Sequence, residues 1–220
     1  MSKYAVIFDM DGVLVDNNPW HIRAWMEFAA KHGRKITPAD VTSRFGCTNQ
    51  DYISFLFERA VGKEEAEQLG EEKEKLYREL YKKEMKPLAG LVSFIESCHA
   101  SGIRIGLGTS APASNAWFVL DGFHIRKYFP VVIDASQISK GKPDPEIYLL
   151  ASAKLGVPAE KCLVFEDSAF GVEAGKRAGM KVAGVLTSHK PEELKKADLL
   201  VHDFTGMTGE TVIEMLKVNE

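Results

Sequence analysis

Acidic residues occur in pairs at two places in this 220-residue sequence, each time directly after an apolar stretch. Asp9 and Asp11 are separated by one residue and follow a stretch that ends at Phe8. Glu166 and Asp167 follow a second stretch of this kind. Side chains two positions apart in an extended chain point to the same side. Two carboxylates about 4 Å apart repel by about 4 kcal/mol at an effective dielectric constant near 20, and a shared proton or a bound cation would relieve that repulsion.

The type of cation follows from the ligands that these pairs offer. Adjacent parallel strands end at the same edge of a sheet, so we expect the four carboxylates to converge. An oxygen-only site without a nearby His or Cys favours Mg²⁺ over zinc. A calcium-binding loop is excluded, because that motif needs Gly at position six and Glu at position twelve. Counted from Asp9, Gly12 is the fourth residue and Trp20 the twelfth.

Two further segments supply groups that bind phosphate. Thr109 and Ser110 come directly after an apolar run, where a hydroxyl and backbone N–H groups can bind phosphate oxygens. Lys142 lies in the Gly-Lys-Pro-Asp-Pro segment 141–145, before a helical pattern. Each piece alone also fits an ordinary loop. Together they offer a nucleophile, metal ligands, a hydroxyl and a cation, the groups that phosphoryl transfer requires.

The composition of the whole chain limits its partners. A formal net charge of −3 gives no electrostatic reason to expect nucleic acid or an anionic membrane as a partner. A hydrophobic fraction of 45% is ordinary for a globular protein. The apolar run Tyr4–Phe8 is too short for a signal peptide or a membrane span, which predicts a cytoplasmic protein. Oligomeric state cannot be read from the sequence, and we expect a monomer.

Apolar runs alternate with helical patterns along most of the chain, which predicts a Rossmann-like, doubly wound α/β fold with a parallel sheet. Gly102, Gly156 and Gly179 lie where helices should end. The expected strands are Tyr4–Phe8, Ile103–Gly108, Val131–Asp134, Leu163–Phe165, Lys181–Val185 and Leu199–Val201. The expected helices are Leu91–Ser101, Ser114–Leu120, Pro145–Leu155 and Gly171–Ala178, with Asp144 capping the third.

One long segment interrupts this alternation. Between residues 17 and 84 only helical spacing is found, including the stripe formed by Ala66, Leu69, Lys73, Leu76 and Leu80. We therefore expect a catalytic core domain of residues 1–16 and 85–220, with an inserted α-helical cap domain of residues 17–84. The charged run Glu64–Lys83 is interpreted as a solvated helix face.

The motifs resemble those of the haloacid dehalogenase-like superfamily in their order and spacing. The matching segments are Asp9–Val13, Thr109-Ser110, Lys142-Pro143 and Glu166–Ser168. The segment Val164–Ser168, with the Gly-Val and Ala-Gly pairs that follow it, is similar to the β-phosphoglucomutase and sugar-phosphate phosphatase branch. That branch carries a helical cap after the first motif.

The resemblance implies a role for each matching residue. Asp9 would attack phosphorus to form an aspartyl-phosphate, and Asp11 would act as general acid and base. Thr109 and Lys142 would hold the transferred phosphoryl group. The ligands of Mg²⁺ would be Asp9, the backbone carbonyl of Asp11, and Asp167, with Glu166 in support.

The predicted cap offers candidate substrate-binding residues, to which Ser110 of the core is added. The segment around His21 resembles a His-x-x-Ala-Trp motif of this branch, and His21 either faces the substrate or packs beside Trp25. The other candidates are Trp25, Arg23, Arg44 and Asn49.

A mutase needs cations for the second phosphate of a bisphosphate intermediate. β-Phosphoglucomutase resembles this chain in the cap but has two cations where Phe45 and Asn49 stand. Contacts of charged groups to phosphate contribute about 1.5–3 kcal/mol each. We therefore expect a phosphatase of a small phosphorylated metabolite. A hexose-phosphate mutase is the alternative, and a non-catalytic binding module is a third reading that the pair Asp9 and Asp11 disfavours.

Overall fold

The computed structural model describes residues 3–44 and 47–217. Its chain divides into two compact units, of which one contains residues 1–16 and 86–220 and the other residues 17–85. The roles of these units as catalytic core and cap stay predictions. Among the described residues, no helix has both the length and the apolar character needed to cross a membrane.

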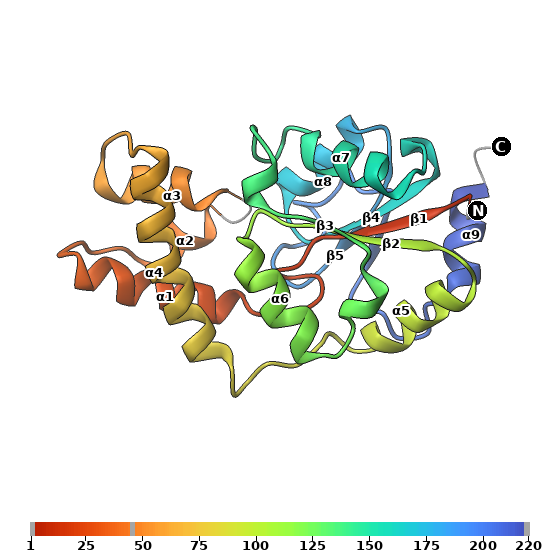
Figure 1. The fold of residues 1–220 in the computed structure, drawn as a ribbon, viewed down its shortest axis with the longest axis horizontal. Helices are drawn as coiled ribbons and strands as arrows, with labels where there is room; N and C mark the ends of the chain where they lie inside the picture. Colours follow the sequence, from red (N-terminus) through yellow and green to blue (C-terminus); the bar gives the residue numbers. More distant parts are fainter. Residues whose placement is uncertain (1–2, 45–46, 218–220) are drawn as a thin grey trace. The chain divides into compact units, whose positions relative to one another are not determined.

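A six-stranded parallel sheet lies at the centre of the larger unit (Figure 1). The strand order is β3-β2-β1-β4-β5-β6, so that β1 lies between β2 and β4. The chain starts in the middle of the sheet and adds strands to both sides, and the predicted doubly wound α/β fold is confirmed. The strands are β1 Ala5–Phe8, β2 Arg104–Gly108, β3 Val131–Ile133, β4 Cys162–Glu166, β5 Lys181–Val185 and β6 Leu199–Val201.

Successive side chains of each strand point to opposite faces of the sheet. The strands therefore contribute to two apolar clusters, one on each face. Phe8 of β1 stacks on Phe165 of β4 with ring centroids 5.3 Å apart. Ile7 and Val164, one residue earlier on each strand, join a separate apolar cluster with residues of α7. The rings that surround Phe8 and Phe165 on their face are Phe94, Phe129 and Phe204.

Helices connect the strands and lie on the two sides of the sheet (Figure 1). Helix α7 packs against β1, β2 and β3, helix α8 packs against β4 and β5, and helix α5 packs against β2 and α9. Short 3-10 turns occur at residues 126–128, 135–137 and 159–161. The helices of this unit are α5 Leu91–Ala100, α6 Ala113–Gly122, α7 Glu146–Leu155, α8 Ala169–Arg177 and α9 Gly209–Lys217.

Several predicted boundaries differ from the structure by one or two residues, including the start of α7 and the end of β4. Pro145 is the N-cap of α7 rather than its first residue, and the Asp144 carboxylate accepts the N–H of Glu146 at 3.1 Å. Strand β4 extends through Glu166, which was expected just after it. Glu166 is therefore held by the sheet itself, and its backbone position is fixed by pairing with β5.

The described residues of the smaller unit form four helices joined by loops and turns. Trp25, Phe28 and Tyr52 belong to its apolar core. Thr37 caps α2 by accepting the N–H of Asp40, while the Asp40 carboxylate accepts the N–H of Thr37. The helices are α1 Asn18–Lys31, α2 Pro38–Thr42, α3 Asn49–Phe57 and α4 Lys63–Tyr81.

The larger unit is continuous across the point where the insert leaves it. The backbone N–H of Leu88 donates to the carbonyl oxygen of Leu14 at 3.0 Å. The backbone N–H of Gly12 donates to the carbonyl oxygen of Val15 at 2.8 Å, which closes a tight turn after β1. The segments on either side of the insert are thus bonded to each other within this unit.

Candidate active site

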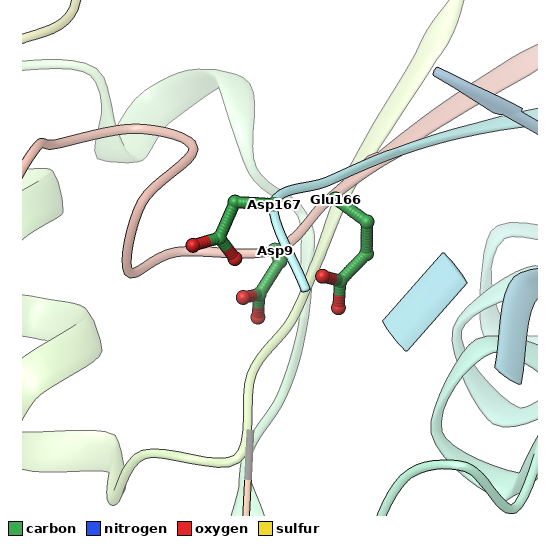
Figure 2. A group of neighbouring side chains, drawn as sticks. All are labelled: Asp9, Glu166 and Asp167. Atoms are coloured by element: carbon green, nitrogen blue, oxygen red, sulfur yellow. The ribbon is translucent and has the colours of Figure 1, made fainter. Parts of the chain in front are cut away.

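Three carboxylates meet where β1 and β4 end (Figure 2). Phe8 is paired with Phe165 in register, and the N–H of Asp9 donates to the Phe165 carbonyl oxygen at 2.9 Å. Side-chain oxygens of Asp9, Glu166 and Asp167 lie within 4.8 Å of one another, and all three residues are buried. The fourth expected carboxylate, Asp11, is half-buried and is not a member of this group, although its charge contributes to the raised pKa of Asp9.

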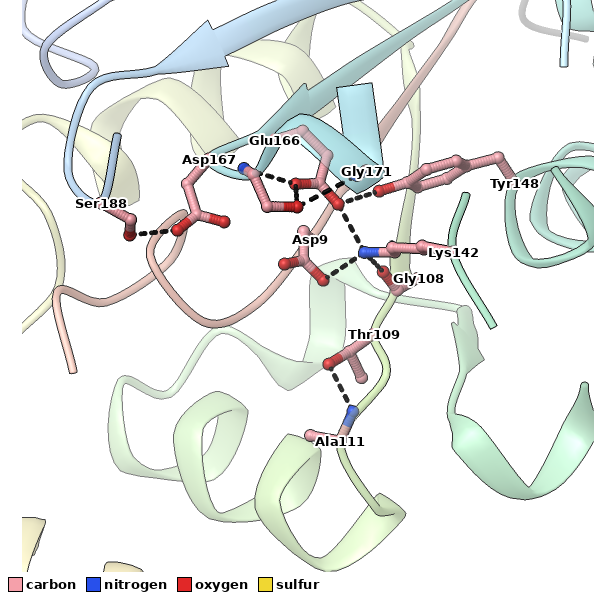
Figure 3. A network of polar contacts seen from close by, with 11 residues as sticks. Asp9, Gly108, Thr109, Ala111, Lys142, Tyr148, Glu166, Asp167, Gly171 and Ser188 are labelled. Atoms are coloured by element: carbon pink, nitrogen blue, oxygen red, sulfur yellow. Dashed lines mark hydrogen bonds and ion pairs between the residues drawn. The ribbon is translucent and has the colours of Figure 1, made fainter. Parts of the chain in front are cut away.

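Lys142 reaches the carboxylates from the loop before α7. Its Nζ donates to Oδ1 of Asp9 at 2.9 Å and to Oε1 of Glu166 at 2.5 Å (Figure 3). A third, longer contact of 3.5 Å joins Nζ to the carbonyl oxygen of Gly108 at the end of β2. The Lys142 side chain is only 1% exposed, so its charge is balanced by these groups rather than by water.

Glu166 receives hydrogen bonds on both of its carboxylate oxygens. Besides Lys142, the hydroxyl of Tyr148 donates to Oε1 at 2.7 Å. The backbone N–H and the hydroxyl of Ser168 both donate to Oε2 at 3.0 Å. A side chain at Gly171 would overlap this carboxylate, so glycine is required there. Glu166 is thus held by α7, by the loop of Lys142 and by the start of α8.

Asp167 points toward a segment that follows β5. The hydroxyl of Ser188 donates to Oδ2 of Asp167 (Figure 3). Nδ1 of His189 lies 2.9 Å from the Asp167 carbonyl oxygen. Gly12 has a φ of +75°, and a Cβ at that position would overlap the Asp167 carboxylate. The turn after β1 therefore passes directly beside Asp167.

Burial and mutual repulsion set the protonation of these groups. Burial, reinforced by Glu166 and Asp11, raises the pKa of Asp9 to about 7 despite the opposing charge of Lys142. Burial, with Glu166 and Asp9, also holds the pKa of Asp167 well above its ordinary value. For Glu166, burial is outweighed by Lys142 and by hydrogen bonds, and its pKa is lowered.

These residues fit a magnesium ion. Three buried carboxylates face one lysine, and burial together with repulsion between the carboxylates raises the pKa values of Asp9 and Asp167. Oxygen ligands of this kind suit a hard divalent cation. Since both oxygens of Glu166 already accept hydrogen bonds, Asp9 and Asp167 are the better placed direct ligands.

The other predicted core residues follow β2. Thr109 is 1% exposed, and its N–H donates to the Ile133 carbonyl oxygen at 2.9 Å. Its hydroxyl accepts the N–H of Ala111 at 3.1 Å, which folds the chain tightly after the strand. Ser110, between them, is half-buried.

The predicted residues of the smaller unit make contacts within that unit. The His21 ring stacks on Tyr77 at 3.8 Å, and Trp25 stacks on Tyr52 at 4.0 Å. Three further candidates have different neighbours: Arg23 pairs with Glu27 at 2.8 Å, Arg44 lies over the Phe55 ring at 3.6 Å, and Asn49 donates to Glu74 at 2.9 Å. Phe45, on which the argument against a mutase partly rests, lies outside the described residues.

Sequence reasoning missed a buried ion pair in this unit. Lys73 and Glu74 are each 2% exposed and lie 2.9 Å apart. Lys73 also lies 2.8 Å from Nδ1 of His21. The interpretation of Glu64–Lys83 as a solvated face is therefore wrong at these two positions. The signal was present, because Lys73 occupies an otherwise apolar helical stripe.

Comparison with known protein families agrees with the geometry of this site. The sequence model of the haloacid dehalogenase-like hydrolases matches residues 4–179. This chain belongs to that family of enzymes.

Individual relatives place the chain more narrowly. The phosphorylated carbohydrates phosphatase of Thermotoga maritima is 37% identical over 84% of this chain and 86% of its own length. The β-phosphoglucomutase of Bacillus subtilis is 31% identical over 96% of this chain and 94% of its own length. A crystal structure of a family IA, variant 3 hydrolase from Entamoeba histolytica has a TM-score of 0.87 and 31% identity, and covers 97% of this chain and 99% of that one. The chain is thus a sugar-phosphate phosphatase-like member with mutase relatives.

Proposed function

We propose that this protein is a Mg²⁺-dependent phosphatase that hydrolyses a small phosphate ester of the sugar-phosphate class. The observation that carries the proposal is the group formed by Asp9, Lys142 and Asp167 at one edge of the sheet. It offers a nucleophile, a buried cation and a metal ligand within one buried group of neighbouring side chains. Phosphoryl transfer relies mainly on such positioning and on neutralisation of charge.

The reaction would proceed in two displacements. In the first, a carboxylate oxygen of Asp9 forms a bond to phosphorus, the ester P–O bond breaks, and the leaving oxygen takes a proton from Asp11. In the second, water attacks the aspartyl-phosphate and gives a proton to Asp11. The bond between phosphorus and Asp9 then breaks, and inorganic phosphate leaves. Asp11 serves both steps because it lies outside the buried cluster and is half-exposed.

The remaining groups would neutralise the negative charge of the phosphoryl group and hold that group in position. Mg²⁺ would be bound by Asp9, Asp167 and the Asp11 carbonyl, and when bound it neutralises negative charge on the phosphoryl group. Lys142 would contact the same group through its Nζ, which already lies beside Asp9. The Thr109 hydroxyl, whose oxygen accepts the N–H of Ala111, would donate its proton to a phosphoryl oxygen.

The test is release of inorganic phosphate from sugar phosphates, nucleotides and pyrophosphate with Mg²⁺ present. We expect turnover of sugar phosphates and its loss in Asp9→Asn. Asp121→Asn is the matched control, since Asp121 is an exposed carboxylate paired with Arg126. Absence of turnover with every ester, or equal turnover by Asp9→Asn and the wild type, would refute the proposal.

A mutase of the β-phosphoglucomutase kind is the second candidate, supported by the relative from Bacillus subtilis that matches nearly the whole chain. Against it, Asn49 is uncharged and its amide is engaged by the Glu74 carboxylate. A bisphosphate intermediate would need cations in the smaller unit. Conversion of β-glucose 1-phosphate to glucose 6-phosphate faster than phosphate release would favour the mutase.

A further inference from the structure

Three consecutive side chains after β5 bind the two loops that carry the proposed metal ligands. Thr187, Ser188 and His189 each contact a different atom of these loops. Nothing in the sequence pattern marks this segment, and the proposed chemistry assigns it no role. Through these side-chain contacts the segment nevertheless links the turn after β1 to Asp167, the residue that follows β4.

The contacts are specific in direction. The Thr187 hydroxyl donates to the carbonyl oxygen of Gly12 at 2.5 Å. The Ser188 hydroxyl donates to Oδ2 of Asp167. Because a carbonyl oxygen only accepts, the ring nitrogen Nδ1 of His189 must be the donor to the Asp167 backbone, at 2.9 Å.

The sheet brings this segment to Asp167. Strand β5 lies next to β4, with Glu166 opposite Gly184. The chain therefore passes the carboxyl end of β4 as β5 ends at Val185, and the N–H of Leu186 remains bonded to the Val201 carbonyl oxygen at 2.8 Å. Residues 187–189 thus extend from a strand that is paired on both sides, which gives the side chains a fixed base.

The contact of Ser188 bears on the carboxylate itself. Asp167 lies between the turn at Gly12 and the hydroxyl of Ser188, and a Cβ at Gly12 would meet both groups. With one oxygen bonded to Ser188, the carboxylate cannot rotate freely about its Cβ–Cγ bond, and its other oxygen is left to bind a cation. Groups that hydrogen-bond a ligating carboxylate orient it and commonly change metal affinity by about 10- to 100-fold when removed.

We propose that Ser188 is a positioning residue that orients Asp167 for Mg²⁺, with Thr187 and His189 fixing the backbone of the two ligand loops around it. The inference rests on the metal site of the proposed function. It adds a residue from the segment that follows β5 to a site otherwise built from the ends of β1, β2 and β4 and the loop before α7. It also explains why three consecutive polar side chains of this segment contact the two loops that carry the proposed metal ligands.

The test is calorimetric titration of the substrate-free, full-length protein with Mg²⁺. We expect Ser188→Ala to bind Mg²⁺ about 10-fold or more weakly, and Ser188→Thr, which keeps a hydroxyl, to bind close to the wild-type affinity. The matched control is Ser101→Ala. Ser101 also donates to a carboxylate, that of Glu210, but it precedes β2 at the opposite end of the strands.

The Mg²⁺ affinities of the variants distinguish an orienting role of Ser188 from a merely structural one. Wild-type Mg²⁺ affinity in Ser188→Ala, even with a lowered melting temperature, would overturn the inference and leave the phosphatase proposal intact. Absence of Mg²⁺ binding by the wild type would overturn both. If Ser188→Ala does not fold, Thr187→Val supplies the second test, and unchanged Mg²⁺ affinity in a folded Thr187→Val would likewise contradict the inference.

Discussion

Nζ of Lys142 and Oδ1 of Asp9 lie 2.9 Å apart, although 133 positions separate the two residues in the sequence. The same Nζ contacts Glu166, so that one buried cation links the end of β1 to the end of β4. Burial opposes the charge of this lysine, but the two carboxylates outweigh it and keep the pKa of Lys142 above its ordinary value. Lys142 is therefore charged at every pH at which the protein would work.

Replacing this cation should strongly impair catalysis. We expect Lys142→Met to lower kcat by about 10²–10³-fold, the usual effect of removing one group that stabilises charge in the transition state. Lys142→Arg should not restore activity, because a planar guanidinium cannot take the place of an ammonium with the same contacts. Lys154→Met, at an exposed lysine bonded to Gln137, is the control in steady-state kinetics. A Lys142→Met enzyme within tenfold of the wild type would contradict this role.

Tyr148 should contribute to stability through its hydroxyl. In Tyr148→Phe the ring stays and one donor to the buried Glu166 carboxylate is lost, with an expected decrease in unfolding free energy of about 1.5–3 kcal/mol. Tyr128→Phe is a matched control, since its hydroxyl contacts Glu96 at 3.4 Å near the surface, and we expect less than about 0.5 kcal/mol there. Urea unfolding measures both. Equal effects of the two changes would argue against the importance of the buried bond.

The buried pair of Lys73 and Glu74 should make the smaller unit sensitive to acid. Burial acts to raise the pKa of Glu74, but Lys73, His21 and hydrogen bonds outweigh it and lower that pKa below 4.5. The stabilisation is then present above the unfolded-state pKa and is lost as the pH falls through the lower, folded-state value.

Glu74→Gln tests this pair directly. It leaves a buried ammonium without its partner, so we expect a loss of about 3–5 kcal/mol at pH 7. The difference from the wild type should narrow as the pH falls below 4.5, because the wild type then loses the same charge. Glu65→Gln, at a surface ion pair with Arg59, is the control for urea unfolding and should have a smaller effect. A difference that is constant with pH would contradict the prediction.

Binding of Mg²⁺ should release protons near neutral pH. With the pKa of Asp9 at about 7 in the metal-free protein, the carboxyl must lose a proton before it can act as a ligand. We expect Mg²⁺ affinity to fall by about tenfold or more per pH unit below pH 7, because the pKa of the second proposed ligand, Asp167, is raised as well. Calorimetry in buffers of different ionisation enthalpy measures the released proton. An affinity that does not change between pH 6 and pH 8 would show that Asp9 is already ionised.

Much of the core was predictable because parallel strands place their carboxyl ends at one edge. Once β1 and β4 are taken as neighbouring strands, Asp9 and Glu166 must lie close together, although the order of the strands does not follow from local patterns. The link from Lys142 to both carboxylates was harder to foresee, because it depends on how the loop before α7 folds back. The contact of Ser188 with Asp167 was not foreseen, since it depends on the course of the chain after β5.

The helical unit shows a different limit of sequence reasoning. Periodicity indicated that this unit is helical without resolving each helix, and charge alone suggested that Lys73 and Glu74 face water. Each is buried because the other neutralises it, and that pairing between adjacent residues leaves no periodic signal. A charged residue within an apolar stripe was the only indication in the sequence, and it pointed to Lys73 but not to its partner.

The hydrogen bond from Leu88 to Leu14 has a consequence for the history of the chain. The two segments that flank the insert already meet, so a short turn could join them without opening the sheet, and the entropy of closing a longer connection grows only slowly with its length. Segments of many sizes could therefore have been exchanged at this junction while the chemical machinery at the strand ends was inherited unchanged. The junction would let selectivity diversify by recombination and would leave the reaction itself conserved.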